Sequence, residues 1–449
     1  MVKDLTVGKP SSVLIRFSLP LFGSIIFQQL YNLADSFIAG KFLGEAALAS
    51  VGNSYEVTLI YLAFAFGCNI GVSVIVSRLF GAKNFKDMKS AVTTTFASVG
   101  VLCAVLMVLG MTLSAPLLRL INTPEDLMHD TLAYLEIYTG GLFFLFFYNI
   151  ATGIFSALGD SKTPFIFLAC SSVANIFVNI LFAVNFGMGV AGLAWATFMC
   201  QGISCVGAVV LLFVKLHHIC PRDDSGKAAF FSPKLLKIIM RIAVPSILQQ
   251  SSISIGNIII QSIINSYGTG VMAGYTAAVK LNAFAINCFT TTGTAMSNFT
   301  SQNLGAEKPD RIRHGFLSGT AMSAIIALIF TSVFCIFPDS MVNLFITDPS
   351  KDAMKAGMNF LYIVSPFYIP ISVKLLSDGV LRGGGAMNHF LVSTCLDLIL
   401  RVLLAFILSA AFESATGIWW AWPIGWVISA VLSFIFYKRG VWSKKEIAL

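Results

Sequence analysis

Long, continuous apolar runs dominate this sequence and set its fold class. Of its 449 residues, 57% are hydrophobic and only 11% are charged, and the mean hydropathy is +0.83. Soluble domains carry about 25% charged residues, so a soluble fold cannot cover this much apolar surface. A helix needs about 20 mostly apolar residues to span a bilayer. Because the runs are continuous rather than alternating, they exclude a transmembrane β-barrel and predict an all-α integral membrane protein.

Breaks at polar residues, Pro and Gly divide the apolar sequence into twelve predicted spans. An even number of spans places both termini on the same side of the membrane. The predicted spans are 14–38, 54–78, 91–113, 131–154, 164–184, 190–214, 236–265, 272–299, 314–336, 356–380, 390–411 and 417–437.

Lys and Arg are unequally distributed between the two sets of loops that these spans define. The loops and tails on the side of the termini hold 22 of them, and the opposite loops hold four. Cytoplasmic loops carry the excess of Lys and Arg, so we expect both termini in the cytoplasm and the chain in the plasma (inner) membrane. The net charge of +8 then reflects topology, and we expect the lipid bilayer as a partner but no nucleic acid.

The two halves of the sequence resemble each other at an offset of about 225 residues. RFSLP at 16–20 is matched by RIAVP at 241–245, and SRLFGA at 77–82 by SQNLGA at 301–306. Each half has six spans, so the second half repeats the first in the same orientation. Such parallel repeats are common in transporters. We therefore predict two six-helix lobes, at 1–214 and 236–449, joined by a cytoplasmic loop at 215–235.

Motifs of ATPases and hydrolases are missing from the sequence. There is no GxxxxGK[ST], GxSxG or HExxH, and the five His lie in loops or at span ends. We therefore expect no enzyme activity, no resident metal and no cofactor. A pump of this kind needs an ion gradient rather than an ATPase subunit, and a membrane-embedded enzyme is disfavoured.

Asp35 is the most informative charge within the predicted spans. It lies on a polar face of the first span, and no basic residue lies within one helical turn of it. A charge at the bilayer centre costs about 2.5–3.5 kcal/mol on insertion scales. We favour a role in binding protons or cations over a carboxylate that simply reaches water outside the hydrocarbon.

Four polar residues in the fourth to sixth spans are candidate partners of Asp35. They are Asn149, Asn175, Asn179 and Thr197, and Asn175 and Asn179 share one helix face. Their oxygens suit a Na⁺ site or a protonated acid. Ordinary hydrogen bonding between membrane helices explains the same residue types equally well.

The second half holds further charges that are secondary candidates. Asp397 and Arg401 are four residues apart, as are Lys374 and Asp378, which is the spacing of helical ion pairs. For Asp397 and Arg401 we favour a local ion pair over direct contact with substrate. Lys280 has no acidic residue within one turn, so any partner lies on another helix.

Taken in order, several motifs resemble the multidrug and toxic compound extrusion (MATE) family across nearly the whole chain. They are QQLYNLADSFIAGKFLGEAALASVG from Gln28, the SRLFGA and SQNLGA pair, GIFSALGDSKTPF from Gly153, GVLRGGG from Gly379 and GIWWAWPIGW from Gly417.

The resemblance implies two six-helix lobes that export toxic amphiphiles in exchange for H⁺ or Na⁺. It also implies a cation site in the amino-terminal lobe, built here from Asp35, Asn149, Asn175, Asn179 and Thr197. Position 179 is often Asp in the family, and the acid of the seventh helix in the NorM-like branch is missing from QQSSISIGNIII. The chain is therefore more similar to the DinF-like branch.

We predict a monomeric secondary antiporter that exports drug-like, cationic amphiphilic small molecules by alternating access. A flippase for a lipid-linked saccharide, from the same superfamily, is the alternative. It would need a cationic cavity for a pyrophosphate, and the few basic residues at membrane depth disfavour it. A channel fits the repeat less well than alternating access does.

Overall fold

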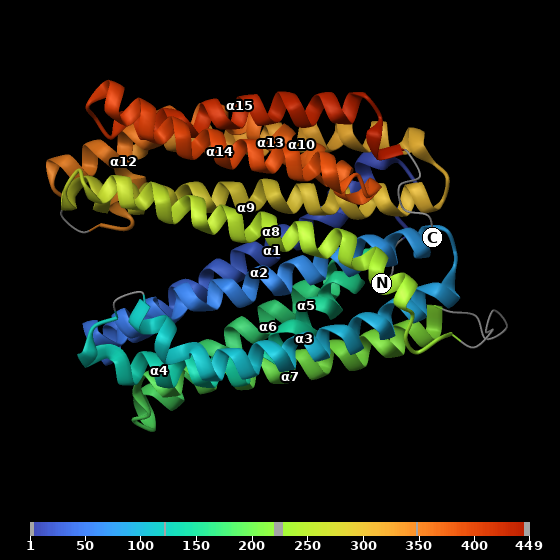
Figure 1. The fold of residues 1–449 in the computed structure, drawn as a ribbon, viewed down its shortest axis with the longest axis horizontal. Coiled ribbons are helices and arrows are strands. Elements are labelled where there is room, and N and C mark those ends of the chain that lie inside the picture. The colour runs from blue at the N-terminus through green and yellow to red at the C-terminus, as the bar shows by residue number, and fades with distance from the viewer. Residues whose placement is uncertain (1–3, 121–122, 220–227, 347–348, 444–449) are drawn as a thin grey trace. The chain divides into compact units, whose positions relative to one another are not determined.

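The computed structural model describes residues 4–120, 123–219, 228–346 and 349–443. In these ranges the ordered structure is helical (Figure 1). The first half contains α1 (Pro10–Ile38), η1 (Ala39–Leu43), α2 (Glu45–Gly81), α3 (Phe85–Leu120), α4 (Glu125–Gly140), α5 (Leu142–Ala157), α6 (Lys162–Asn179), η2 (Ile180–Asn185) and α7 (Gly189–Ile219). The second half contains α8 (Pro233–Asn265), α9 (Thr269–Gly305), α10 (Pro309–Ile336), α11 (Pro338–Asn343), α12 (Lys351–Val364), η4 (Ser365–Phe367), α13 (Tyr368–Gly384), α14 (Met387–Phe412), α15 (Thr416–Lys438) and η5 (Val441–Ser443).

These helices confirm the predicted twelve spans. Ten elements are long and apolar enough to cross a bilayer, and α4 with α5 forms another span bent by 49°. The remaining span is α9, which has 37 residues but a more polar sequence. Its polar residues, such as Thr292, Asn298 and Asn303, are buried in the protein. These polar side chains of α9 therefore do not face lipid.

Backbone turns confirm the internal repeat. Lys83 and Glu307, 224 residues apart, both follow a long helix with φ of 56°. Gly44 and Gly268 begin the equivalent helices α2 and α9 with φ of 97° and 93°. Few residue types adopt a positive φ readily. Its recurrence at these matched positions shows that the two halves form the same turns.

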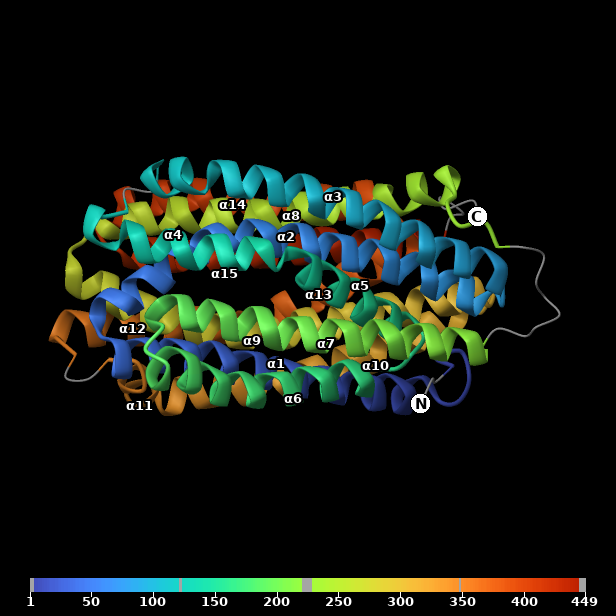
Figure 2. The same cartoon turned by 90° about the horizontal axis from the view of Figure 1, so that it is seen from below.

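The helices form two compact units. Figure 2 shows the same helices from a second direction. In the first unit, α5 packs against α2 and α7. In the second, α9 packs against α13 and α12, and α14 packs against α15.

Two helices are divided between the units. The segment Leu5–Ser18, which includes the start of α1, belongs to the second unit, and α1 belongs to the first unit from Leu19 onward. Similarly, α8 belongs to the first unit up to Ile247 and to the second from Leu248. The predicted boundaries 1–214, 215–235 and 236–449 stay a prediction, and residues 220–227 lie outside the described ranges.

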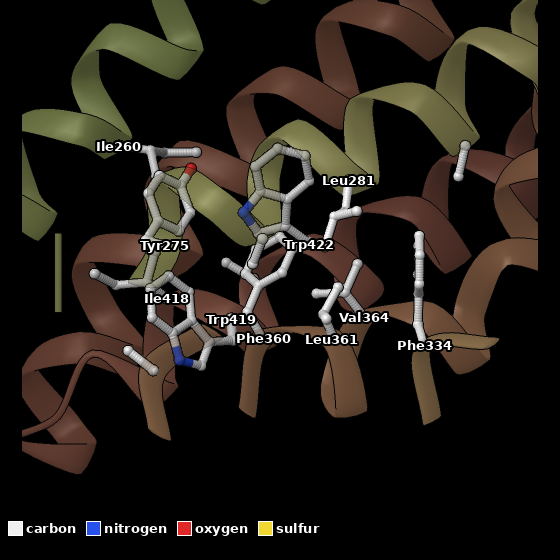
Figure 3. Close-up of a cluster of buried hydrophobic side chains, with 14 of the residues drawn as sticks. Ile260, Tyr275, Leu281, Phe334, Phe360, Leu361, Val364, Ile418, Trp419 and Trp422 are labelled. Carbon is white, nitrogen blue, oxygen red and sulfur yellow. The ribbon is translucent and has the colours of Figure 1, made fainter. Parts of the chain in front are cut away.

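Each unit has its own apolar core. The core of the second unit contains rings from α9, α12, α13 and α15, and Figure 3 shows Tyr275, Trp419, Phe360 and Trp422 within it. Tyr275 stacks on Trp419 with ring centroids 5.1 Å apart. Phe360 meets both tryptophans edge-on, at 5.4 Å from Trp419 and 5.8 Å from Trp422. Offset and edge-on arrangements are the favourable geometries for aromatic rings.

Candidate functional site

Asp35 and Asn179 lie where their helices change geometry. Asp35 is three residues from the end of α1, which continues into the π-helical turn η1. Asn179 is the last residue of α6, which continues into the π-helical turn η2. The two π turns contact each other in the first unit. π-Helical turns are rare and occur frequently at functional sites, so these two turns support a functional role for this region.

Hydrogen bonds link Asp35 to two of its four predicted partners, to Asn179 directly and to Asn175 through Asn179. The Asn179 side-chain nitrogen donates to Asp35 Oδ1 at 2.5 Å and to Asn175 Oδ1 at 2.7 Å. Thr197 lies beside this network, and its Oγ1 is 3.0 Å from the hydroxyl of Tyr31, which is one turn before Asp35 on α1. The structure therefore brings α1, α6 and α7 together around one carboxylate.

The network is largely shielded from water. Asn179 is fully buried and Asn175 is 1% exposed, while Asp35 is partly exposed. Apolar residues of the first unit, including Ile38, Ala39 and Ala183, form a cluster beside them. Polar contacts are stronger in such surroundings than in water.

Two atoms of the network have no partner among the described residues. They are the Asn179 side-chain oxygen and the Asn175 side-chain nitrogen, and both are buried. A buried polar atom without a partner costs about 1–3 kcal/mol. The unused oxygen of Asn179 lies next to the Asp35 carboxylate, and together they offer the hard oxygen ligands that alkali cations prefer.

Asn149 is not joined to this network by any hydrogen bond among the described residues. Its side-chain nitrogen donates to Leu145 O in its own helix at 2.8 Å. Its backbone oxygen accepts from Asn69 Nδ2 at 2.7 Å. Asn149 therefore takes part in the packing of α5 against α2. Its position in the sequence alone does not reveal this contact.

Tyr31 is a site residue that the sequence analysis missed. It lies one turn before Asp35 on the same face of α1, so helical spacing was the signal that marked it. A tyrosine in an apolar span resembles a core residue, and only the positions of Thr197 and Asp35 show its role.

In the second unit, Lys374 and Asp378 form the predicted ion pair. Their atoms lie 2.8 Å apart, and both side chains are at most 3% exposed. Ser433 on α15 donates to the other oxygen of Asp378 at 2.7 Å. Both carboxylate oxygens are therefore occupied, so Asp378 is neutralised locally.

The predicted ion pair between Asp397 and Arg401 is wrong. No salt bridge joins them in the described part of the chain. Ser429 donates to Asp397 at 3.3 Å, and the Arg401 guanidinium instead lies over the Trp422 ring, 4.6 Å from its centroid. The i,i+4 spacing permits contact, but the neighbouring helix α15 supplies competing partners for both side chains.

Lys280 is exposed and makes no ion pair within the described ranges. Its Nζ lies 5.9 Å from the centre of the Phe345 ring. Contact of this kind with an exposed ammonium contributes about 0.5–1 kcal/mol, and a role of Lys280 in a site stays a prediction.

A buried ion pair at the α5–α6 turn was not predicted. Lys215 on α7 bonds to the Asp160 carboxylate, which also accepts from Thr163 N at 3.1 Å and Thr163 Oγ1 at 2.8 Å. Burial alone would raise the pKa of Asp160, but the hydrogen bonds from Lys215 and Thr163 outweigh it and hold this pKa below its usual value. Asp160 thus fixes the start of α6, the helix that carries Asn175 and Asn179.

Comparison with known proteins identifies the family. The MatE family model matches residues 20–181 and matches again over residues 245–407. The chain belongs to the MatE family. MatE proteins are transporters rather than enzymes, and the double match begins at Pro20 and at Pro245, in agreement with the repeat.

Full-length relatives support the same assignment. The Bacillus subtilis (strain 168) protein named "Probable multidrug resistance protein YpnP" is 30% identical over 457 residues, covering 99% of this chain and 98% of its own. A Shewanella oneidensis protein named "FAD transporter" is 24% identical and covers 95% and 94%. A Thermotoga maritima relative is named NorM, so placement nearer the DinF-like branch of the MatE family stays a prediction.

Solved structures share the fold over almost the whole chain. One described as an outward-facing multidrug resistance MATE family transporter superposes with a TM-score of 0.91, at 24% identity and 98% coverage of both chains. A transporter from Pyrococcus furiosus superposes with a TM-score of 0.90, at 23% identity and 97% coverage of both chains. At these identities the likeness concerns the fold.

Proposed function

We propose that this MatE protein is a secondary antiporter that exports drug-like amphiphiles in exchange for H⁺ or Na⁺. The observation that carries the proposal is the Asp35–Asn179 hydrogen bond beside an unused, buried amide oxygen. Intramembrane carboxylates are costly, and they commonly mark proton or ion pathways.

The Asp35 network suits an exchange of ions. Asp35 is acceptor-only when ionised, and its Oδ1 already accepts from Asn179. A bound proton or Na⁺ would neutralise this carboxylate, and Na⁺ would also use the side-chain oxygen of Asn179. The sequence contains no nucleotide-binding motif, so an ion gradient is the energy source that the proposal assigns.

The substrate class is drawn from the relatives. Several are named multidrug resistance or multidrug export proteins, and one is named a FAD transporter. From the Lys and Arg distribution we assign the chain to the plasma membrane with both termini in the cytoplasm. We assign alternating access to its two repeated lobes and take the protein to act as a monomer.

Reconstituted vesicles test the proposal. Purified protein in proteoliposomes is loaded with a fluorescent cationic dye, and a pH gradient or a Na⁺ gradient is imposed in turn. One of the two gradients should drive dye transport, and its collapse by an ionophore should stop it. Equal transport with neither gradient present would overturn the antiport mechanism.

A further inference from the structure

The short segment before α1 is held against the second unit, to which it belongs. This arm, Leu5–Gly8, ends at Gly8 with a φ of 87°, two residues before α1 begins. Leu5 is 2% exposed and Thr6 is 6% exposed, although neither lies in a helix. Residues near a chain terminus are poorly ordered unless they are tied down, so burial of this arm requires specific contacts.

Backbone groups of the arm bond to side chains of α9 and of the turn between α9 and α10. Leu5 N donates to Gln302 Oε1 at 3.0 Å, and Leu5 O accepts from Asn303 Nδ2 at 3.4 Å. Lys308 Nζ donates to Thr6 O at 3.2 Å. Gln302 and Asn303 are fully buried. The second unit therefore binds the arm through its backbone.

Arg311 on α10 holds both ends of the arm. Its Nη1 donates to Gly8 O at 2.8 Å, and its Nη2 donates to Leu5 O at 3.3 Å. Its Nε donates to Asn303 Oδ1 at 2.9 Å, which orients the amide that also binds Leu5. Hydrogen bonds from a charged donor are about twice as strong as neutral ones. Loss of this one side chain should therefore release the arm.

The first repeat carries other residue types at the matched positions. At the repeat offset of 224 residues, the counterparts of Gln302, Asn303 and Arg311 are Arg78, Leu79 and Asp87. Leu79 has no amide, and Asp87 has the opposite charge to Arg311. Residues 228–231, which precede α8, are exposed. The bound arm is therefore a feature of the second unit and does not follow from the duplicated fold.

The helix α1 connects this attachment to the candidate ion site. Its first turns pack in the second unit, where Leu14 is 1% exposed and a Cβ on Gly319 of α10 would meet it at 3.3 Å. From Leu19 onward α1 belongs to the first unit, and Asp35 near its end is bonded to Asn179. One continuous helix thus has its start fixed in one unit and its carboxylate in the other.

We propose that Arg311 and the arm anchor the start of α1, so that ion binding at Asp35 is transmitted to the second unit. The inference rests on the proposed antiport function and deepens it by naming a connection through which the ion site drives export. Arg311 is a positioning residue, because it acts through α1. When the arm is released, an ion still binds at Asp35, but the start of α1 moves without the second unit.

Amide hydrogen exchange measures whether Arg311 holds the arm. In the full chain in nanodiscs, Arg311→Gln should speed exchange in the peptide that contains Leu5 and Thr6 at least about 10-fold, because local opening exposes the Leu5 amide. Arg313→Gln is the matched control, since Arg313 is an exposed arginine on the same helix and its loss changes the net charge equally. Unchanged exchange in Arg311→Gln would overturn the anchoring.

Transport and binding, measured together, separate a loss of coupling from a loss of structure. Arg311→Gln should lower gradient-driven efflux of the cationic dye rhodamine 6G from proteoliposomes about 5-fold, and the dissociation constant of the dye should stay within about 2-fold of wild type. Arg311→Lys keeps the charge and should recover part of the efflux. Efflux equal to wild type in Arg311→Gln would overturn the proposal, as would an affinity that falls as far as the efflux.

A double-mutant cycle tests whether Arg311 acts through the arm. Deletion of residues 4–8 should lower efflux about 5-fold, and adding Arg311→Gln to the deletion should cause no further loss, because its partner is already gone. An additive loss of about 25-fold would contradict the proposal. If wild type exports dye under neither an H⁺ nor a Na⁺ gradient, the antiport function fails and the coupling role falls with it, while hydrogen exchange still reports whether the arm is anchored.

Discussion

Asn179 donates a 2.5 Å hydrogen bond to Asp35 across 144 residues of sequence. The bond joins the ends of α1 and α6, each of which continues into a π-helical turn. The side-chain oxygen of Asn179 stays buried and without a partner. An ion bound to Asp35 therefore acts directly on both turns.

Asp35→Asn should fold but lose gradient-driven export by at least 10-fold. The amide keeps the size of the side chain and a hydrogen bond to Asn179, but it cannot exchange a proton or balance the charge of Na⁺. Dye efflux from proteoliposomes under H⁺ and Na⁺ gradients measures the loss. Wild-type rates under both gradients would place the coupling site elsewhere.

Asn179→Asp should be milder than Asp35→Asn. It adds a carboxylate beside Asp35, and two adjacent carboxylates share a proton, so coupling to H⁺ is retained with efflux within about 3-fold of wild type. Asn149→Ala is the control, because no hydrogen bond in the described part of the chain joins Asn149 to the network. A larger loss in Asn149→Ala than in Asn179→Asp would contradict the arrangement.

Asp160→Asn should destabilise the protein by about 1–3 kcal/mol at neutral pH, because it removes the charged acceptor of Lys215 and Thr163. The folded-state pKa of Asp160 is lowered. Its contribution is therefore complete above the unfolded value of about 3.9 and is lost as the pH falls through the folded-state value. Thermal unfolding at pH 7 and at pH 3 should show the difference shrinking at the lower pH.

The exposed Asp126 provides the control for that measurement. Asp126→Asn should change the free energy of unfolding by no more than about 0.5 kcal/mol. A pH-independent difference between wild type and Asp160→Asn would show that the ion pair does not stabilise the start of α6.

Topology is testable by labelling from outside the cell. In a Cys-free background, an impermeant thiol reagent should miss a cysteine at Ser225 and label one at Asp348, because the loops carrying most Lys and Arg are cytoplasmic. Both positions lie outside the described residues. The opposite labelling pattern would invert the assigned orientation.

Gly379→Ala should lower the free energy of unfolding by about 1–3 kcal/mol. A Cβ on Gly379 would clash with the backbone oxygen of Gly293, so α9 and α13 would have to separate. Gly52→Ala is the matched control, because a Cβ there meets nothing within 4 Å. Thermal unfolding of both variants measures the difference, and equal stability would argue against close packing of α9 on α13.

The fold was predictable because hydropathy and repetition act over tens of residues. Long apolar runs require bilayer-spanning helices, and the matched turns at Lys83 and Glu307 follow from matched sequence. Thr and Asn residues lower the hydropathy of α9, and they pack inward rather than toward lipid.

The sites were predictable only in part, because each side chain can choose between partners on its own helix and partners on neighbouring helices. The family resemblance implies Asp35, Asn175, Asn179 and Thr197, and hydrogen bonds join the first three in the structure. Thr197 is hydrogen-bonded to Tyr31 instead. Spacing alone cannot tell that Trp422 attracts Arg401 away from Asp397.

The bond between Asp160 and Lys215 was beyond sequence reasoning for another reason. The two residues are 55 positions apart, and neither belongs to a motif with a fixed spacing. Only the packing of α7 beside α6 brings the ammonium to the carboxylate.

The division of α1 and α8 between the units bears on how such a chain arose. Each unit is completed by the opening segment of the helix that begins the other repeat. A half-length ancestor folded this way would have exchanged that segment with a second copy, as domain-swapped dimers do. In the present chain this exchange is intramolecular, so each half of the sequence lacks the segment that completes its own unit.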